Sequence, residues 1–408
     1  MESYKFLLDL AVILLCTKVL GLATKRVQMP QVVGSLLAGL LLGPSMLGLL
    51  TETEFLSNVA ELGVIVLMFC AGLETDIKEL KKSGKAAFVI ALCGVIVPII
   101  GGFAVAYFFN KPGVIDSDAS CSVVLQNAFI GVILTATSVS ITVETLKEMG
   151  KLKTHSGNAI LGAAIIDDIL GIVALTIITS LADESVNVAV VLLKVVLFFV
   201  FACVVGFVFY KFYKKWIESA DRGRHRHAII AFVFCLLISY VAEAWFGVAD
   251  ITGAYIAGLI ISNTERSEFI QSRFDTLSFL LLSPVFFASI GMKTNLDGLN
   301  GSMILFSIIL LIIAILSKVV GCGLGAKICK CTNKEALRIG VGMISRGEVA
   351  LIVAQKGYQA GMLSDDLFAP IVLVVIVTTL ITPILLSMVF KGEKPQDTPA
   401  APAEGANI

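Results

Sequence analysis

Charged residues are scarce in this sequence, and neither sign prevails. Asp, Glu, Lys and Arg make up 15% of the 408 residues, the formal net charge is zero, and there are only three histidines and two tryptophans. This balance gives no indication of nucleic-acid binding, which usually leaves a basic patch. The start of the chain also lacks a strongly basic region followed by a small-residue cleavage site, so the first apolar run is expected to be a retained helix.

Close-spaced cysteines are rare as well. Nine cysteines are scattered, mostly singly within apolar runs, where they behave as small apolar side chains. Only Cys329 and Cys331 lie close together, in a basic loop without a neighbouring histidine. That spacing does not favour a zinc site, and we expect neither a structural metal nor a resident cofactor.

Long apolar runs are what the sequence does contain. Hydrophobic residues make up 57% of the chain, and the mean hydropathy of +0.94 is far above that of a soluble domain. Thirteen runs are long enough to cross a bilayer as helices. They begin near residues 4, 30, 57, 86, 121, 156, 187, 227, 250, 277, 302, 335 and 367. We therefore predict an all-α polytopic membrane protein with 13 transmembrane helices.

The loops between these runs alternate in charge. The basic loops are 25–26, 78–85, 147–153, 211–226, 266–273 and 327–338, and the acidic or nearly neutral ones are 52–54, 116–118, 183–184 and 365–366. Because basic loops stay in the cytoplasm, this pattern places the N-terminus outside the cell membrane and the C-terminus inside. The polar, Pro- and Ala-rich tail 391–408 is expected to be disordered.

An internal repeat is visible in the glycine pattern. Residues 31–40 (QVVGSLLAGL) are echoed by residues 250–259 (DITGAYIAGL), and the same offset of 219 residues maps 72–76 onto 291–295. Such patterns also recur in membrane helices simply because they allow close packing. The paired helices are seven apart, so the two copies would cross in opposite directions. We therefore predict an inverted repeat of two six-helix units, an arrangement typical of secondary transporters.

Two segments have the composition of interrupted helices. Residues 135–142 place a series of threonine and serine hydroxyls at mid-membrane, and residues 340–349 are glycine-rich and contain Arg346 and Glu348. Ordinary hydrogen bonding between helices is the alternative for the hydroxyls. If the two segments cross, their helix ends carry partial charges of about ±0.5. Arg346 or Glu348 would then offset part of that charge.

The least expected feature is the adjacent pair Asp167 and Asp168, in the middle of the apolar run 160–178. An acid at this depth costs roughly 2.5–3.5 kcal/mol on insertion scales. The pair is therefore expected to face a cavity, to have a partner or to serve a function. The alternative is a buried polar contact that only locks helices together.

A buried amine accompanies the pair. Lys318 lies about halfway along the apolar run 304–326 and needs an anion, for which Asp167 and Asp168 are the most suitable groups. Glu74 and Glu144 lie near the cytoplasmic ends of their predicted helices. They are expected to be solvated or to cap those helices.

These residues favour ion exchange. Neighbouring desolvated carboxylates can hold either protons or a cation. A small hard cation such as Na⁺ or Li⁺ prefers oxygen ligands, which Asp168, Asp167, Thr137 and Ser138 could supply. If Lys318 pairs with one of these aspartates only when the site is empty, more than one proton is exchanged per cation. The hypothesis is an electrogenic antiporter for Na⁺ or Li⁺ and H⁺.

Two other classes remain open. An ion channel needs a continuous pore, which buried charge and paired interrupted helices disfavour. An intramembrane aspartyl protease also uses two carboxylates that share a proton. Its two carboxylates should approach from different helices, whereas these are neighbours in sequence, so we do not expect an enzyme.

Several motifs together resemble the monovalent cation:proton antiporter-2 family, close to its NapA-type sodium/proton antiporters. They are residues 38–44, 69–76, 135–142, 166–168, 317–318 and 345–350. The resemblance implies that Asp168 binds the cation directly and that Asp167 pairs with Lys318. It also implies a homodimer in which an ion-carrying core moves against a dimerisation scaffold in an elevator-like cycle.

Mapped onto this sequence, the resemblance divides the chain into scaffold, core and linker. The scaffold would comprise residues 1–83 and 216–300, the core 84–182 and 301–390, and the linker helix 183–215. A potassium/proton antiporter of the same family is the alternative. Kef-type potassium members usually lack the double aspartate and carry a nucleotide-binding domain after the last helix, so the features here favour sodium.

Overall fold

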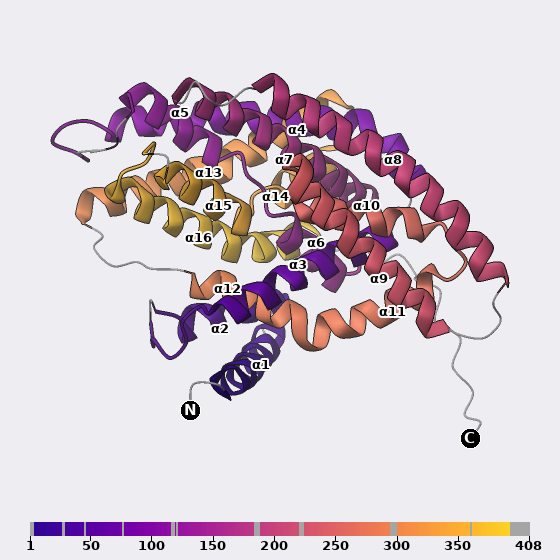
Figure 1. Ribbon diagram of the computed structural model, residues 1–408. Coiled ribbons are helices and arrows are strands. Elements are labelled where there is room, and N and C mark those ends of the chain that lie inside the picture. Colours follow the sequence, from indigo (N-terminus) through magenta and orange to yellow (C-terminus); the bar gives the residue numbers. More distant parts are fainter. Residues whose placement is uncertain are drawn as a thin grey trace.

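The computed structural model describes the chain in ten segments, residues 4–26, 29–44, 46–75, 77–115, 119, 121–182, 188–219, 224–293, 300–359 and 361–391. All regular structure in these segments is helical (Figure 1). Nine helices of the described part, counted with their direct continuations, are long and apolar enough to cross a membrane. An all-helical membrane protein is therefore confirmed in outline.

The elements in chain order are α1 (Lys5–Arg26), α2 (Gln31–Leu42), α3 (Glu54–Glu74), α4 (Ile77–Phe109), α5 (Val123–Ile133), α6 (Val139–Glu148), α7 (His155–Ala182), α8 (Val188–Ser219), α9 (Arg224–Val241), η2 (Ala242–Phe246), α10 (Asp250–Ser262), α11 (Ser267–Leu277), η3 (Ser278–Leu282), α12 (Ser283–Met292), α13 (Gly301–Ile328), α14 (Asn333–Gly342), α15 (Gly347–Gln359) and α16 (Asp365–Val389). The elements η2 and η3 are single π-helical turns that continue α9 and join α11 to α12.

Local capping chemistry explains where several helices begin. Thr53, Ser122, Asn300 and Thr332 each accept a hydrogen bond from a backbone amide three residues later, at the starts of α3, α5, α13 and α14. Short polar side chains at this position satisfy amides that have no partner within the helix. These four starts are thus specified by the sequence next to each helix.

Two predicted helix starts are wrong. The run predicted near 86 belongs to α4, which begins at Ile77, and the run predicted near 277 is the continuation of α11, which begins at Ser267. Hydropathy locates the apolar part of a helix, and both helices extend beyond it into polar sequence. Seven of the eleven residues of α11 are polar or charged, so the stretch is helical but not apolar.

Helix packing divides most of the chain into two groups (Figure 1). In the group that we call the α4/α13 bundle, α4 packs against α5, α7 and α13, and α16 packs against α13, α14 and α15. In the α3/α10 bundle, α3 packs against α10 and α12, α2 against α1 and α12, and α9 against α10. The helices α6 and α8 contact members of both bundles.

Two backbone-to-backbone contacts hold the α3/α10 bundle together. Gly39 of α2 faces Gly291 of α12, and Gly72 of α3 faces Gly258 of α10. A Cβ atom at Gly39 would overlap the carbonyl oxygen of Ala288, and one at Gly258 would overlap the carbonyl oxygen of Phe69 of α3. Only glycine therefore permits these helices to approach so closely.

Some predicted features lie outside the described residues. These are the tail from 392 to 408, the Thr294–Asn295 half of the second sequence match, and the side chain of Glu348.

Candidate functional site

The candidate site lies where two broken helices meet. The helix α5 ends at Ile133 and α6 begins at Val139, while α14 ends at Gly342 and α15 begins at Gly347. Gly347 has a φ of +49°, a left-handed backbone conformation that glycine adopts without strain. Both breaks are buried, so their backbone groups need partners within the protein.

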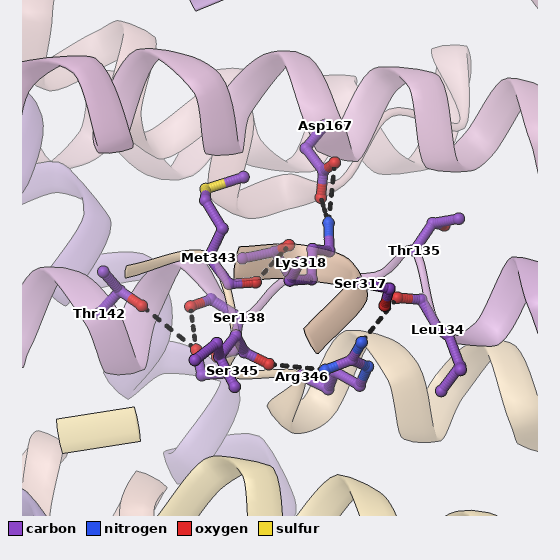
Figure 2. Close-up of polar contacts among 12 residues, drawn as sticks. Leu134, Thr135, Ser138, Thr142, Asp167, Ser317, Lys318, Met343, Ser345 and Arg346 are labelled. Carbon is purple, nitrogen blue, oxygen red and sulfur yellow. Dashed lines mark hydrogen bonds and ion pairs between the residues drawn. The ribbon is translucent and has the colours of Figure 1, made fainter. Parts of the chain in front are cut away.

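The two unwound segments supply those partners to each other (Figure 2). The Ser138 amide donates to the Ser345 carbonyl at 2.7 Å, and the Ser345 hydroxyl donates to the Ser138 carbonyl at 3.0 Å. The Thr142 hydroxyl donates to the Gly342 carbonyl at 2.8 Å. The hydroxyl groups of the two segments thus replace helix hydrogen bonds at the crossing.

A fully buried arginine joins the crossing to a third helix. The Arg346 guanidinium donates to the carbonyls of Leu134 at 3.0 Å, Ala314 at 2.9 Å and Ile344 at 2.7 Å. Leu134 is the C-cap of α5, and Ala314 belongs to α13. The Arg346 guanidinium therefore lies at the negative, carboxy-terminal end of the α5 dipole, where a positive charge is favourable.

A buried ion pair lies beside the crossing (Figure 2). Lys318 Nζ of α13 is 3.0 Å from Asp167 Oδ2 and 3.1 Å from Oδ1 on α7, and the two side chains are 0% and 1% exposed. Gly94 of α4 covers the pair, since a Cβ atom there would be 3.8 Å from both Asp167 Oδ1 and Lys318 Nζ. A pair this deeply buried leaves an uncompensated charge if either partner is removed.

Asp168 has a different environment from its neighbour. It is only half-buried and, with Asp167, it lines a cavity of about 70 Å³. The other lining residues are Val132, Thr135, Ala136, Gly171, Ile172, Leu175, Ala249, Val349 and Val353. One water molecule needs about 10–15 Å³ of such volume, so the cavity has room for a cation and part of its hydration shell. Asp168 thus borders a cavity of sufficient volume for an ion.

The predicted hydroxyl ligands lie at different places. The Thr137 side chain interacts with the Asp167 carboxyl group and is 3.5 Å from the Met343 carbonyl. Ser138 instead shares a hydrogen bond with the Ser140 hydroxyl at 3.1 Å and lies against Gly347. The structure therefore brings Asp167, Thr137 and Lys318 together and places Ser138 within the crossing.

Two further residues border the site and are not among the predicted ligands. Thr135 belongs to the predicted hydroxyl segment 135–142, whereas Thr379 is in no predicted motif. Thr135 lines the cavity beside Asp168. Thr379, which is 1% exposed on α16, accepts a hydrogen bond from the Gly347 amide at 3.1 Å and so caps the start of α15. Three threonines at 378, 379 and 382 within an apolar run were the available signal for this second position.

The expectation that Glu74 is solvated or caps a helix is wrong. Its side chain is 9% exposed and forms an ion pair with Lys147 of α6 at 3.1 Å. Glu144 is half-buried and lines a second cavity of about 200 Å³ between α1, α2, α6 and α12. Within the described residues, no group of three or more His, Cys, Asp or Glu side chains could hold a metal ion. Any cation at Asp168 would thus need hydroxyl, carbonyl or water oxygens as further ligands.

Known proteins match this chain over nearly its whole length. Residues 11–392 match the family model described as sodium/hydrogen exchanger, transmembrane. The chain is 39% identical to the Na(+)/H(+)-K(+) antiporter GerN of Bacillus cereus, over 95% of this chain and 97% of the relative. It is 35% identical to the Na(+)/H(+) antiporter of Enterococcus hirae, over 94% and 97% of the two chains.

A solved structure has the same fold. The sodium proton antiporter MjNhaP1 from Methanocaldococcus jannaschii, determined at pH 8, aligns with a TM-score of 0.71 at 20% identity. The alignment covers 95% of this chain and 97% of that one. The two chains therefore share one fold over nearly their whole length.

Proposed function

The chain belongs to the sodium/hydrogen exchanger family of monovalent cation:proton antiporters, and on that premise we propose that it exchanges Na⁺, or Li⁺, for protons across the cell membrane. One observation carries the proposal. A carboxylate that faces a cavity, Asp168, is the direct neighbour of a carboxylate that is neutralised by a buried lysine, Asp167. The two acids can therefore respond differently to a cation or a proton.

Exchange works by competition for the carboxylates. In the empty protein Lys318 neutralises Asp167, and Asp168 in the cavity is the acid that a proton or a cation reaches first. When a cation binds Asp168 and Asp167 together, Lys318 loses its partner and releases a proton. Together with the proton displaced from Asp168, this gives two protons for one cation. The cycle is therefore electrogenic.

Oxygen atoms complete the proposed cation site. Asp168 and Asp167 supply charge and Thr137 supplies a hydroxyl oxygen next to Asp167. Ser138 joins only if its bond to Ser140 rearranges when the ion arrives. Hard monovalent cations favour such a set of carboxylate and hydroxyl oxygens.

Polar and charged groups at the crossing offset the partial charges of the helix ends. Arg346 offsets the negative end of α5, and Thr379 caps the positive end of α15. We assign Glu348, the second residue of α15, to this group from its place in the sequence alone. We assign these groups a structural role rather than direct contact with the ion.

We further propose 13 membrane crossings that form two inverted six-helix units. The glycine contacts of the α3/α10 bundle support this repeat. The offset of 219 residues exchanges Gly39 with Gly258 and Gly72 with Gly291, so each contact corresponds to the other. The carbonyl groups that face these glycines also correspond, since Ala288, which faces Gly39, and Phe69, which faces Gly258, are 219 residues apart.

We propose that the chain divides into two parts that move relative to each other, a division that the two helix bundles support. Residues 84–182 and 301–390 form the ion-carrying core, residues 1–83 and 216–300 form the scaffold, and residues 183–215 link them. The core moves against the scaffold in an elevator-like cycle, and the scaffold forms a homodimer. The N-terminus is outside and the C-terminus is cytoplasmic, as the basic loops require.

Potassium is the second candidate cation. The observation that favours it is the name of the relative GerN, which includes K(+) beside Na(+). Measuring in proteoliposomes whether K⁺ competes with Na⁺ for proton exchange distinguishes the two candidate cations.

Removal of the cavity carboxylate tests the proposed function. In proteoliposomes with a pH-sensitive dye, Asp168→Asn is expected to abolish Na⁺-driven proton flux while the protein stays monodisperse. Asp366→Asn, which removes an acid at the start of α16, is the matched control and keeps its flux. Retained flux in Asp168→Asn contradicts the proposal.

A further inference from the structure

The carboxy-terminal turn of α6 is fastened to the α3/α10 bundle by side chains that the ion site does not use. Lys147 Nζ lies 3.1 Å from Glu74 Oε1 on α3 and 2.5 Å from Asp275 Oδ1 on α11. Gln271, one turn before Asp275, donates to Glu74 Oε1 at 2.9 Å and to Asp275 Oδ2 at 3.4 Å. One ammonium group thus joins α6 to α3 of the α3/α10 bundle and to α11, which packs against α3.

The next residue of α6 makes a second attachment. Glu148 Oε2 accepts a hydrogen bond from the backbone amide of Gln31 at 2.6 Å, at the first residue of α2. The first amides of a helix have no partner within it and lie at the positive end of its dipole, so a carboxylate is favoured there. Glu148 therefore caps a helix of the α3/α10 bundle instead of its own.

The other end of α6 belongs to the crossing. Ser138 at its N-cap and Thr142 in its first turns are hydrogen-bonded to the break between α14 and α15. The ten residues of α6 rise only about 15 Å, so a single short helix connects the crossing to the attachments at Lys147 and Glu148. A displacement of the α4/α13 bundle along the other one must break these attachments or deform α6.

The cavity and the attachments lie on opposite sides of the site. From Asp168 the cavity extends past Gly171 to Leu175, towards the end of α7 that the loop charges place outside. Lys147 and Glu148 lie in the basic region that the same rule places in the cytoplasm. The cavity that includes Asp168 therefore lies on the exterior side of the site. The ion pairs lie on the cytoplasmic side, where the second cavity, lined by Gln31 and Glu148, includes neither aspartate.

We propose that Lys147 and Glu148 of α6, with Glu74, Asp275 and the Gln31 amide, form a latch that holds the exchanger outward-open and must release for the site to face the cytoplasm. The proposal rests on the proposed function and its topology. The latch is suited to repeated opening. Lys147 and Asp275 are 25% and 32% exposed, so water and salt weaken their attraction. The pair at the ion site is 0% and 1% exposed, so water and salt do not weaken its attraction in this way.

Releasing a latch changes the half-saturating Na⁺ concentration in opposite directions at the two faces of the membrane, so the test compares these faces. We would measure Na⁺-driven proton exchange in right-side-out and everted vesicles from cells without other Na⁺/H⁺ antiporters. In Lys147→Gln the outward-open state is less favoured. The half-saturating Na⁺ concentration is then expected to rise at the exterior face and fall at the cytoplasmic face, each about two- to fivefold. Lys153→Gln, an exposed lysine on the same side, is the matched control and changes neither value.

A second variant keeps the test decisive if Lys147→Gln folds poorly. Asp275→Asn leaves the Lys147–Glu74 contact in place and is expected to shift both values in the same directions, but less. The double variant should match Lys147→Gln, because both changes act on one contact. Equal shifts at both faces, or no shift in either variant, overturn the latch. Loss of all exchange in the unmodified protein would instead overturn the proposed function.

Discussion

Two lysines join helices through carboxylates in this protein, and their surroundings give them different roles. Lys318 and Asp167 are 0% and 1% exposed beside the helix crossing. Lys147 is 25% exposed, with partners Glu74 at 9% and Asp275 at 32%. The same chemical pair is thus shielded from water and salt in one place and open to both in the other, because burial determines how strongly water competes for the charges.

The two ion pairs also belong to different steps of the proposed cycle, namely ion binding and the movement of the two bundles. The buried pair lies next to Asp168 and its cavity, where a change of charge affects what the site binds. The partly exposed pair lies at the far end of α6, where it joins the two bundles. We infer that the first governs coupling of protons to the cation and that the second governs which way the site faces.

The largest effect is expected at the buried pair. Lys318→Gln leaves Asp167 charged and without a cation partner, which should destabilise the protein by about 3–5 kcal/mol. Combining it with Asp167→Asn removes both charges and should restore most of the loss. Thermal unfolding in detergent measures both. A single variant as stable as the unmodified protein would remove the distinction between the two lysines.

The same variants test coupling. If Lys318 carries one of the exchanged protons, exchange in a Lys318→Gln protein that still transports should no longer respond to membrane potential. Flux measured against potassium diffusion potentials checks this. An unchanged dependence on potential would exclude Lys318 from proton coupling.

An intermediate effect is expected at Arg346. Its guanidinium reaches three carbonyls, and a lysine has a single ammonium that cannot reproduce this geometry. Arg346→Lys keeps the charge but loses part of the contacts, which should cost about 1–3 kcal/mol. Thermal unfolding compared with Arg338→Lys, a partly exposed arginine on α14, measures the difference. Equal losses in both variants would show that the buried contacts are unimportant.

The smallest effect on stability is expected at the latch. Lys147→Gln should lower stability by no more than about 1 kcal/mol, because its partners remain partly solvated. Raising the salt concentration should reproduce the change in the unmodified protein and have little effect in the variant. Unfolding measured at two ionic strengths tests this. A loss as large as that of Lys318→Gln would mean that the two pairs are not different in kind.

Much of the fold and part of the site were accessible from the sequence, for identifiable reasons. Asp167, Asp168 and Lys318 stand out because charge within a long apolar run is costly. The two breaks were accessible because hydroxyl and glycine clusters are unusual at mid-membrane. The start of α11 was not, since a helix outside the apolar layer has no hydropathy signal.

Other features depend on contacts that no local pattern encodes. An unwound segment has no helical period, so the sequence could not tell that Thr135 faces the cavity while Ser138 lies within the crossing. The partners of Lys147 come from residues 74 and 275, in ordinary polar segments far apart in the chain. Only the packing of α3, α6 and α11 brings these side chains together.

Proton release on cation binding tests the central claim most directly. Na⁺ would be added to purified protein in weakly buffered solution, and the change in pH recorded. Competition at the carboxylates predicts that Na⁺ binding releases protons from the unmodified protein and that Asp168→Asn releases none. Na⁺ binding without proton release, or equal release from Asp168→Asn, would contradict the account.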